Sequence, residues 1–223
     1  MPVKVGLSRG APNALVSLKN DSTDETRYQV ELFAWGEHRD GTMDLSPSKD
    51  LVVFPGLFAL KPGEQRNLRV GALPTLFAPV ERTYRLFIQE LPPEQRPLGV
   101  VGVRVLTRIG IPVFLTPVAP ATARSTLTDL SAAGGKLSFT LRNGGNVHLR
   151  PSAVKAVAQG SAGDVIADRS WDSWYVLAGG ERVYEGPLPA ENCKRVRVVA
   201  VEIALEKDSL KSSIATPRGT CAP

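Results

Sequence analysis

Residues that carry out chemistry are scarce in this chain of 223 residues, which has only two histidines and two cysteines. His38 lies in a polar turn and His148 follows a glycine turn. Neither stands near a cysteine or carboxylate at the spacing of a metal or nucleophilic site. The Gly-Gly pairs separate short apolar segments, which is typical of hairpin turns and not of phosphate-binding loops. We therefore expect no catalysis, no metal and no cofactor.

Long apolar runs and concentrated positive charge are missing as well. No stretch approaches the roughly 20 apolar residues that a membrane helix requires, so we expect no membrane insertion. Lysine and arginine exceed aspartate and glutamate by 27 to 22, and no basic cluster is interleaved with aromatic residues. This modest balance is typical of a soluble protein, and we expect no nucleic-acid partner.

The two cysteines, Cys193 and Cys221, both lie in the last third of the chain. By composition alone they could form one disulfide in an oxidising compartment or remain two inert thiols. Their position favours a bridge that ties the C-terminal tail to a strand. No secretion signal is visible after Met1, so the residues leave open a cytosolic protein or a secreted one whose signal has been removed.

Glycine and proline, in contrast, are plentiful, with 20 and 18 residues spread along the chain. They separate short segments of alternating polar and apolar residues, which predict strands joined by turns. About seven such segments lie on each side of the stiff stretch 116–121, a pattern expected of two immunoglobulin-like β-sandwiches in tandem. The sequence thus predicts an all-β fold with an N-terminal domain at 1–118, a linker at 119–121 and a C-terminal domain at 122–223.

Several of these strands carry specific expectations. Segments 3–7 and 13–18 are predicted to form one edge strand that is broken or kinked by a Gly/Pro turn. In the segment 27–35 we expect Trp35 to lie in the core. The strands predicted in the second half lie at 127–130, 136–142, 154–159, 165–169, 174–177, 181–185 and 194–206.

One run, Gly99–Leu115, is more apolar than any other part of the chain. Alternate residues of a strand face opposite sides, so the odd positions from Val101 to Val113 form one apolar face. The even positions are small, basic or helix-breaking. The pattern predicts one long strand, and a strand this apolar must be covered or it recruits another strand.

Four basic residues interrupt otherwise apolar strand patterns: Lys4, Arg85, Arg104 and Arg108. Each one alone could simply face solvent. Together, on strands expected to line a cleft between the two domains, they would attract a carboxylate, for example the C-terminus of an extended peptide.

A family resemblance rests on several stretches that occur in a specific order. They are YQVELFAW (Tyr28–Trp35), Asp50–Val70, TYRLFIQELPP (Thr83–Pro93), RIGIPVFLTP (Arg108–Pro117) and NGGNVHLR (Asn143–Arg150). In this combination the chain resembles the PapD-like periplasmic chaperones of chaperone–usher pilus assembly, most closely the archaic (alternative) class. The resemblance covers the whole first half and, more loosely, the second.

The resemblance implies donor-strand complementation, in which the chaperone lends a strand to a pilus subunit that lacks its own last strand. The donor strand would be 100–111, and the residues inserted into the subunit would be Val101, Val103, Val105 and Ile109. The subunit's C-terminal carboxylate would be anchored by Lys4 with Arg85, and by Arg108 in reserve. Pro112 stands where better-known members have a lysine, so the anchor departs from their pattern.

The resemblance also implies two sandwiches in an L shape with a cleft between them, a periplasmic location and a Cys193–Cys221 disulfide. The expected partners are pilus subunits and an outer-membrane usher, and two copies could also pair through the donor strand. A structural pilus subunit or adhesin made of two sandwiches is the alternative. A carbohydrate-active sandwich enzyme is a weaker one, because no pair of carboxylates suggests it.

Overall fold

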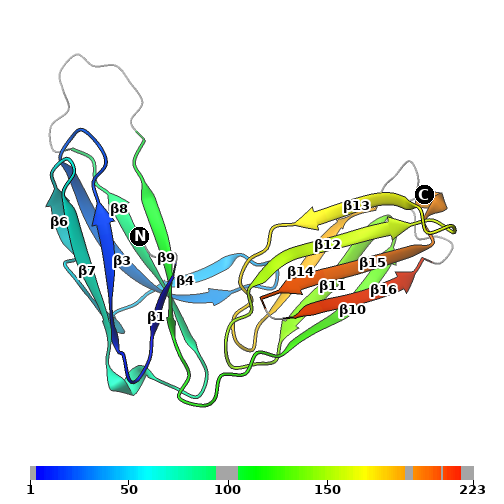
Figure 1. Ribbon diagram of the computed structural model, residues 1–223, viewed down its shortest axis with the longest axis horizontal. Coiled ribbons are helices and arrows are strands. Elements are labelled where there is room, and N and C mark those ends of the chain that lie inside the picture. Colours follow the sequence, from blue (N-terminus) through cyan, green and yellow to red (C-terminus); the bar gives the residue numbers. More distant parts are fainter. Residues whose placement is uncertain (1–3, 94–104, 189–192, 207, 217–223) are drawn as a thin grey trace. The chain divides into compact units, whose positions relative to one another are not determined.

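The computed structural model describes residues 4–93, 105–188, 193–206 and 208–216, and in these ranges the chain is built of strands with two short 3-10 helices (Figure 1). It divides into two compact units. The first contains Met1–Gly36 and Asp44–Pro120, and the second contains Glu37–Met43 and Ala121–Pro223. The all-β prediction is confirmed. The assignment of the hairpin tip Glu37–Met43 to the second unit was not anticipated from the sequence.

The first unit is a sandwich of two sheets. One sheet has the strand order β1-β9-β8-β3-β4, with β6 also paired to β3, and the other has the order β2-β7-β5. The strands are β1 (Val5–Leu7), β2 (Asn13–Lys19), β3 (Thr26–Glu37), β4 (Met43–Pro47), β5 (Leu51–Phe54), β6 (Leu57–Leu60), β7 (Gln65–Ala72), β8 (Arg82–Glu90) and β9 (Arg108–Leu115), with a 3-10 helix at Pro74–Leu76.

The first edge strand is divided between the two sheets. Val5–Leu7 pairs in parallel with β9, whereas Asn13–Lys19 pairs antiparallel with β7 in the opposite sheet. Ser8 and Ala11 exchange two backbone hydrogen bonds of 3.1 Å at the crossing. The predicted break at the Gly/Pro turn is confirmed, and the turn carries the chain from one sheet to the other, so that β1 covers only a short part of β9.

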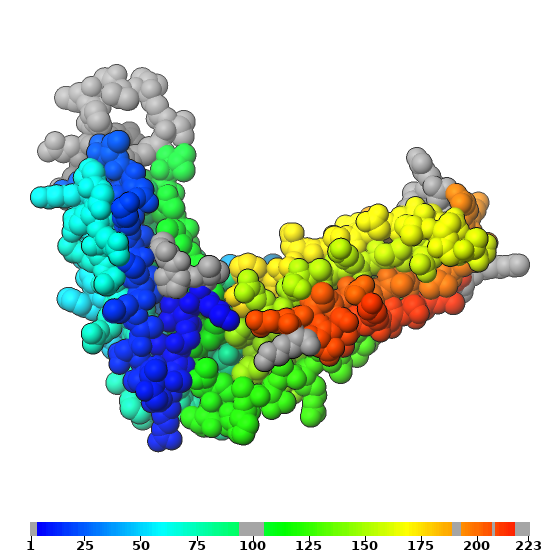
Figure 2. All heavy atoms as spheres, in the orientation of Figure 1, coloured from blue at the N-terminus to red at the C-terminus, as the bar shows by residue number. Residues whose placement is uncertain are grey.

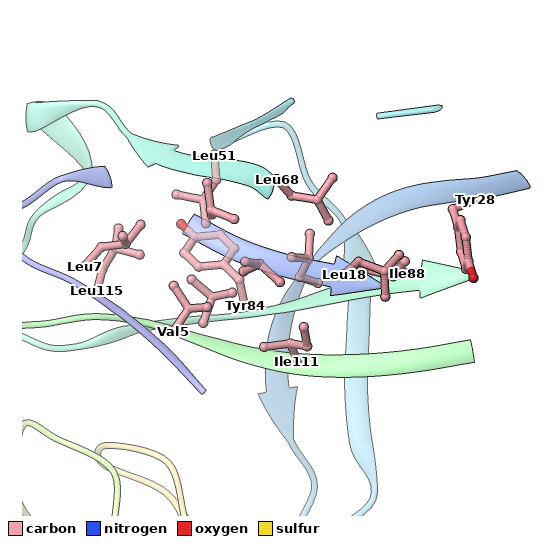
Figure 3. Packing of buried hydrophobic residues seen from close by; sticks show 14 of the residues in the cluster. Val5, Leu7, Leu18, Tyr28, Leu51, Leu68, Tyr84, Ile88, Ile111 and Leu115 are labelled. Atoms are coloured by element: carbon pink, nitrogen blue, oxygen red, sulfur yellow. The ribbon is translucent and has the colours of Figure 1, made fainter. Parts of the chain in front are cut away.

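The core of the first unit lies between its two sheets. Figure 3 shows side chains of β1 and β9, such as Val5 and Ile111, facing Leu51 and Leu68 of the opposite sheet. Ile111, Val113 and Leu115 on β9 are fully buried there, as the odd-numbered alternation predicts. The side of β9 that the sequence marks as apolar is thus the side that holds the sandwich together.

Trp35 is buried, but not in this core. Residues Tyr28, Val30, Leu32 and Ala34 of β3 face the core, so Trp35 projects from the opposite face of the sheet. There its ring lies 6.0 Å from that of Phe114, centroid to centroid. The expected burial of Trp35 is confirmed, but the residue is buried on the outer face of the sheet, which positions 33 and 35 share.

The second unit is also a sandwich, with sheets ordered β10-β11-β14 and β13-β12-β15-β16. Its core includes Phe139, Val154, Ile203 and the buried Cys193. The backbone N–H of Val183 donates to the carbonyl of Arg39, so the hairpin tip pairs with β14. The strands are β10 (Ser125–Ala133), β11 (Lys136–Asn143), β12 (Pro151–Gln159), β13 (Val165–Trp171), β14 (Glu181–Pro187), β15 (Val198–Leu205) and β16 (Ser209–Ala215), with a 3-10 helix at Cys193–Arg195.

One strand prediction in this unit fails, and another places the start of its strand too early. Residues 174–177 form only an isolated bridge between Leu149 and Val176 instead of a strand. The segment 194–206 begins as the 3-10 helix, and β15 starts only at Val198. The strand β16 had not been predicted, because its alternation is between exposed and half-buried residues and gives a weak apolar signal.

Candidate functional site

The strand predicted at Gly99–Leu115 is shorter than expected. In the described part of the chain β9 begins at Arg108, and Val105–Thr107 precede it without regular strand structure. Val101 and Val103 lie outside the described residues. The described apolar residues of this run therefore form two groups. Those after Arg108 pack in the core, and Val105 and Leu106 before it are exposed.

One side of β9 is an open sheet edge over most of its length. The N–H of Glu90 donates to the carbonyl of Thr107, so the backbone groups of the odd-numbered residues point to β8. Those of the even-numbered residues point away, toward β1. However, β1 pairs only with Val113–Leu115. Among the described residues, no strand pairs with this side of β9 between Arg108 and Pro112.

Pro112 is compatible with this edge, because no backbone hydrogen bond of the described sheet is lost there. Its missing N–H would point to the open side, where no partner strand in the described chain requires a donor. Proline in a sheet is tolerated at such edge positions and is costly in central strands. The edge thus presents the N–H groups of Arg108 and Gly110 to the outside.

Apolar side chains continue beyond the start of β9 at the surface. Val105 is 82% exposed and Leu106 is 37% exposed. In the space-filling view the green residues that precede and open β9 stand at the surface of the first unit (Figure 2). Ile109 differs from them, because it is half-buried against the first core and lies opposite Ile88 on β8.

A cleft opens where β2 faces the beginning of β9. It has a volume of about 630 Å³. Its lining residues are Ser17, Leu18, Lys19, Asn20, Asp21, Ser22, Tyr28, Gln65, Glu90 and Ile109. The cleft thus lies between the two sheets, since Leu18 belongs to β2 and Ile109 to β9.

Lys4 and Arg85, two of the three residues predicted to bind a carboxylate, lie in one row across the sheet with Pro112 between them. Pro112 pairs with Arg85, and Val5 pairs with Val113, so the register of β1 continued back by one residue brings Lys4 alongside Pro112. Side chains in one row share a face, and two strand spacings put the Lys4 and Arg85 backbones about 10 Å apart. Lys4 is exposed. The row therefore places two basic side chains on either side of a proline, on the outer face of the sheet.

Arg85 is held firmly in this row. It is only 4% exposed, and its guanidinium carbon lies 4.3 Å from the centre of the Trp35 ring. Cation–π packing of this kind stabilises a buried charge and fixes its orientation. The Trp35–Phe114 pair thus acts as a platform for Arg85.

Arg108 lies apart from that row. It is four residues from Pro112 along β9, which corresponds to about 13 Å. Its guanidinium carbon is 4.0 Å from the centre of the Phe87 ring, and its Nη2 is 3.7 Å from Oε2 of Glu31. The three predicted basic residues therefore lie at two separate positions on the outer face. Lys4 and Arg85 share one row, and Arg108 packs on Phe87.

The aromatic residues under these arginines were not recognised from the sequence as part of a site. Phe33 and Phe87 contact edge to face at 5.5 Å between ring centres. The ring of Phe87 also lies over Gly110, where an added Cβ would be 2.9 Å from the ring. The signal was present in the alternation, since positions 33, 35, 85 and 87 share one outer face, but the register between distant strands is not visible in a sequence.

The remaining observations concern metal ligands, membrane-spanning helices and the two cysteines. Within the described ranges no group of three or more acidic, histidine or cysteine residues could hold a metal ion. No described helix is long and apolar enough to cross a membrane. Cys193 is buried in the second core, and its predicted partner Cys221 lies outside the described residues.

Comparison with solved structures shows which proteins share this fold. The chaperone in the CsuC–CsuE chaperone–tip adhesion subunit complex of Acinetobacter baumannii is 17% identical, with a TM-score of 0.62 and 96% of each chain covered. The CupB2 chaperone of Pseudomonas aeruginosa is 16% identical, with a TM-score of 0.59 over 97% of this chain and 98% of that one. A Salmonella enterica structure of SafA pilin in complex with the SafB chaperone is 16% identical, with a TM-score of 0.60 over 96% of this chain and 93% of that one.

The family is shown by the sequence itself. A comparison with curated proteins gave no match. However, the family model described as pili and flagellar-assembly chaperone, PapD N-terminal domain, matches residues 2–121, which is more than half of the chain. This range contains β1 to β9, including the open edge and the row of basic residues. The chain therefore belongs to the family of PapD-like pilus-assembly chaperones, which are not enzymes.

Proposed function

We propose that this chain is a periplasmic chaperone of the archaic class that binds pilus subunits by donor-strand complementation. The strand it lends consists of the residues that lead into β9 and the beginning of β9 itself. It completes the fold of a subunit that lacks its last strand, prevents premature polymerisation and delivers the subunit to an outer-membrane usher.

The observation that carries this proposal is the open edge of β9 together with the exposed Val105 before it. An exposed apolar strand edge is a site for pairing with another chain, and soluble proteins ordinarily cover it. Burial of one valine side chain in a groove contributes about 1.5 kcal/mol, in addition to the backbone hydrogen bonds. Val101, Val103 and Val105 would occupy successive pockets on one face. Ile109 lies at the base of this series, where it already contacts the core of its own domain.

The row of Lys4, Pro112 and Arg85 supports an anchor for the subunit's C-terminal carboxylate. Arg85 is immobilised on Trp35, while the exposed Lys4 can close over a bound carboxylate from the other side. Charge-assisted hydrogen bonds to a carboxylate are stronger than neutral ones. In this arrangement Arg85, one strand away, supplies the charge that Pro112 cannot.

The solved relatives support a role with pilus subunits. The related chaperones of A. baumannii and S. enterica were solved in complex with a tip adhesion subunit and a pilin, respectively. A periplasmic location would also permit the predicted Cys193–Cys221 disulfide, which would fix the C-terminal tail to the second domain.

Co-expression with a pilus subunit tests the proposal. The double variant Val103→Asp, Val105→Asp places charges where apolar pockets are expected, and we predict that recovery of the complex falls at least about tenfold. Val165→Asp is the matched control, because Val165 is 63% exposed on β13 of the second unit. Equal recovery with the double variant and the control, both folded, would show that this segment does not donate a strand.

A further inference from the structure

The surface around Arg108 lies next to the open edge of β9 but apart from the Lys4–Arg85 row. Arg108 projects on the same outer face as Gly110 and Pro112, and its side chain is 46% exposed. A strand that pairs with the open edge would bring its own side chains about 5 Å from this residue. A side chain of the bound partner would therefore come to lie beside Arg108.

The guanidinium of Arg108 is oriented before any partner binds. Its guanidinium carbon lies over the Phe87 ring, and Phe87 in turn contacts the ring of Phe33 and the bare backbone of Gly110. A guanidinium that stacks through its face keeps its N–H donors in the plane and free for other acceptors. Any side chain at position 110 would displace the ring and with it the arginine.

Glu31 satisfies this charge only in part. Its Oε2 is 3.7 Å from Nη2 of Arg108, which is beyond hydrogen-bond distance, and its side chain is 38% exposed. Exposed ion pairs of this kind contribute little. A carboxylate that reached Arg108 at hydrogen-bond distance from the edge side would form the stronger pair.

We infer that Arg108 is a specificity residue that pairs with an acidic side chain on the strand of the bound subunit. The inference rests on the proposed function, because it takes the partner to be a strand on the edge of β9. If the subunit's C-terminal carboxylate lies at the Lys4–Arg85 row, its last strand must run toward that row in the direction of β9. The residue opposite Arg108 then lies about four positions before the subunit's C-terminus.

The experiment measures binding of a pilus subunit, diluted from urea, to the full-length chain and its variants. Arg108→Glu should weaken binding at least about tenfold, because it places like charges across the edge. Lys155→Glu makes the same change of net charge on the exposed surface of β12 and should leave binding unchanged. Glu31→Gln should leave affinity equal or higher, since it removes the competing carboxylate.

A charge exchange identifies the partner residue. Each acidic residue in the subunit's last strand is replaced by lysine, and one replacement near the fourth position from the end should restore binding to Arg108→Glu while weakening binding to the unaltered chain. Arg108→Lys, which keeps the positive charge but not the planar guanidinium that contacts Phe87, should bind with intermediate affinity. Circular dichroism and melting temperature establish that each variant is folded.

The outcomes separate this inference from the proposed function. If Arg108→Glu binds as the unaltered chain does while Val103→Asp, Val105→Asp abolishes binding, donation stands and the role of Arg108 is refuted. If Arg108→Glu weakens binding but no acid-to-lysine replacement restores it, the acidic partner residue is refuted. If the valine variant binds normally, the proposed function itself fails.

Discussion

Asn20 and Asn143 make the same pattern of hydrogen bonds in the two units, each buried at the end of a strand where its amide closes the following turn. The Nδ2 group of Asn20 donates to the carbonyls of Asp24 and Leu60 at 2.8 and 2.9 Å. That of Asn143 donates to the carbonyls of Val147 and Val176 at 2.8 and 3.0 Å. Each side-chain oxygen accepts a 3.0 Å hydrogen bond from the backbone N–H two residues later.

Replacement of either asparagine by alanine should destabilise the protein. Each substitution removes the hydrogen bonds that the buried amide donates to backbone carbonyls, two for Asn20 and three for Asn143, and the one that its oxygen accepts from a backbone N–H, so the free energy of unfolding should fall by about 2–4 kcal/mol. Asn67 on β7 is exposed, and Asn67→Ala should change the free energy of unfolding by less than about 0.5 kcal/mol. Urea unfolding measures all three variants. A loss for Asn20→Ala or Asn143→Ala as small as that of the control would contradict the structural role.

The stability of the first unit should depend on pH in the alkaline range through Tyr84. Its hydroxyl donates to Oδ2 of Asp50 at 2.8 Å, and burial together with this carboxylate raises the pKa of Tyr84 from 10 to about 12. The protonated phenol is the form that the folded state favours. Its contribution is therefore complete below pH 10 and is lost as the pH rises toward 12.

Comparison with Tyr84→Phe isolates this contribution. Between pH 10 and 12 the unaltered chain should lose on the order of 2 kcal/mol more of its free energy of unfolding than the variant does. The other tyrosines and the lysines titrate in both proteins and cancel in the difference. Parallel pH profiles for the two proteins, measured by urea unfolding, would show that Tyr84 does not carry the effect.

The anchor proposal predicts a specific pattern for Lys4. Lys4→Ala should weaken subunit binding by about five- to tenfold without a change in melting temperature, because the side chain is exposed and its proposed partner is a carboxylate. A subunit extended by a few residues at its C-terminus should lose affinity for the unaltered chain to a similar extent. For the extended subunit, Lys4→Ala should then cost little more.

The Lys4 prediction has a matched control on the second unit. Lys155→Ala removes an exposed lysine from the second unit and should have no effect on binding. Independent, additive losses from Lys4→Ala and from the extended subunit would mean that Lys4 does not contact the subunit's chain end.

The sequence predicted the parts of the fold that depend on local alternation. The apolar odd positions of β9 from Ile109 to Leu115 face the core as expected, and the two-sandwich fold follows from turns and short strands. The burial of Trp35 was predicted, but its packing against Phe114 and Arg85 on the outer face of the sheet was not.

Contacts between distant strands could not be derived from the sequence. The placement of Lys4 and Arg85 in one row with Pro112 depends on the register of β1, β9 and β8, and these strands are separated by long stretches of chain. The stacking of Arg108 on Phe87 depends on the same register and on the absence of a side chain at Gly110. The β1–β2 crossing was missed because one segment of alternating residues gives no indication of which sheet each half joins.

Backbone hydrogen exchange, resolved by residue with NMR, tests strand donation most directly. The N–H groups of Arg108 and Gly110 point to the open edge, whereas those of Ile109 and Ile111 point to β8. In the free chain we predict rapid exchange at Arg108 and Gly110 and slow exchange at Ile109 and Ile111. In the complex with a pilus subunit, exchange at Arg108 and Gly110 should slow at least about 100-fold, as expected for amides that enter a stable sheet. Rapid exchange at these two amides in the fully bound chain would contradict pairing of the subunit with β9.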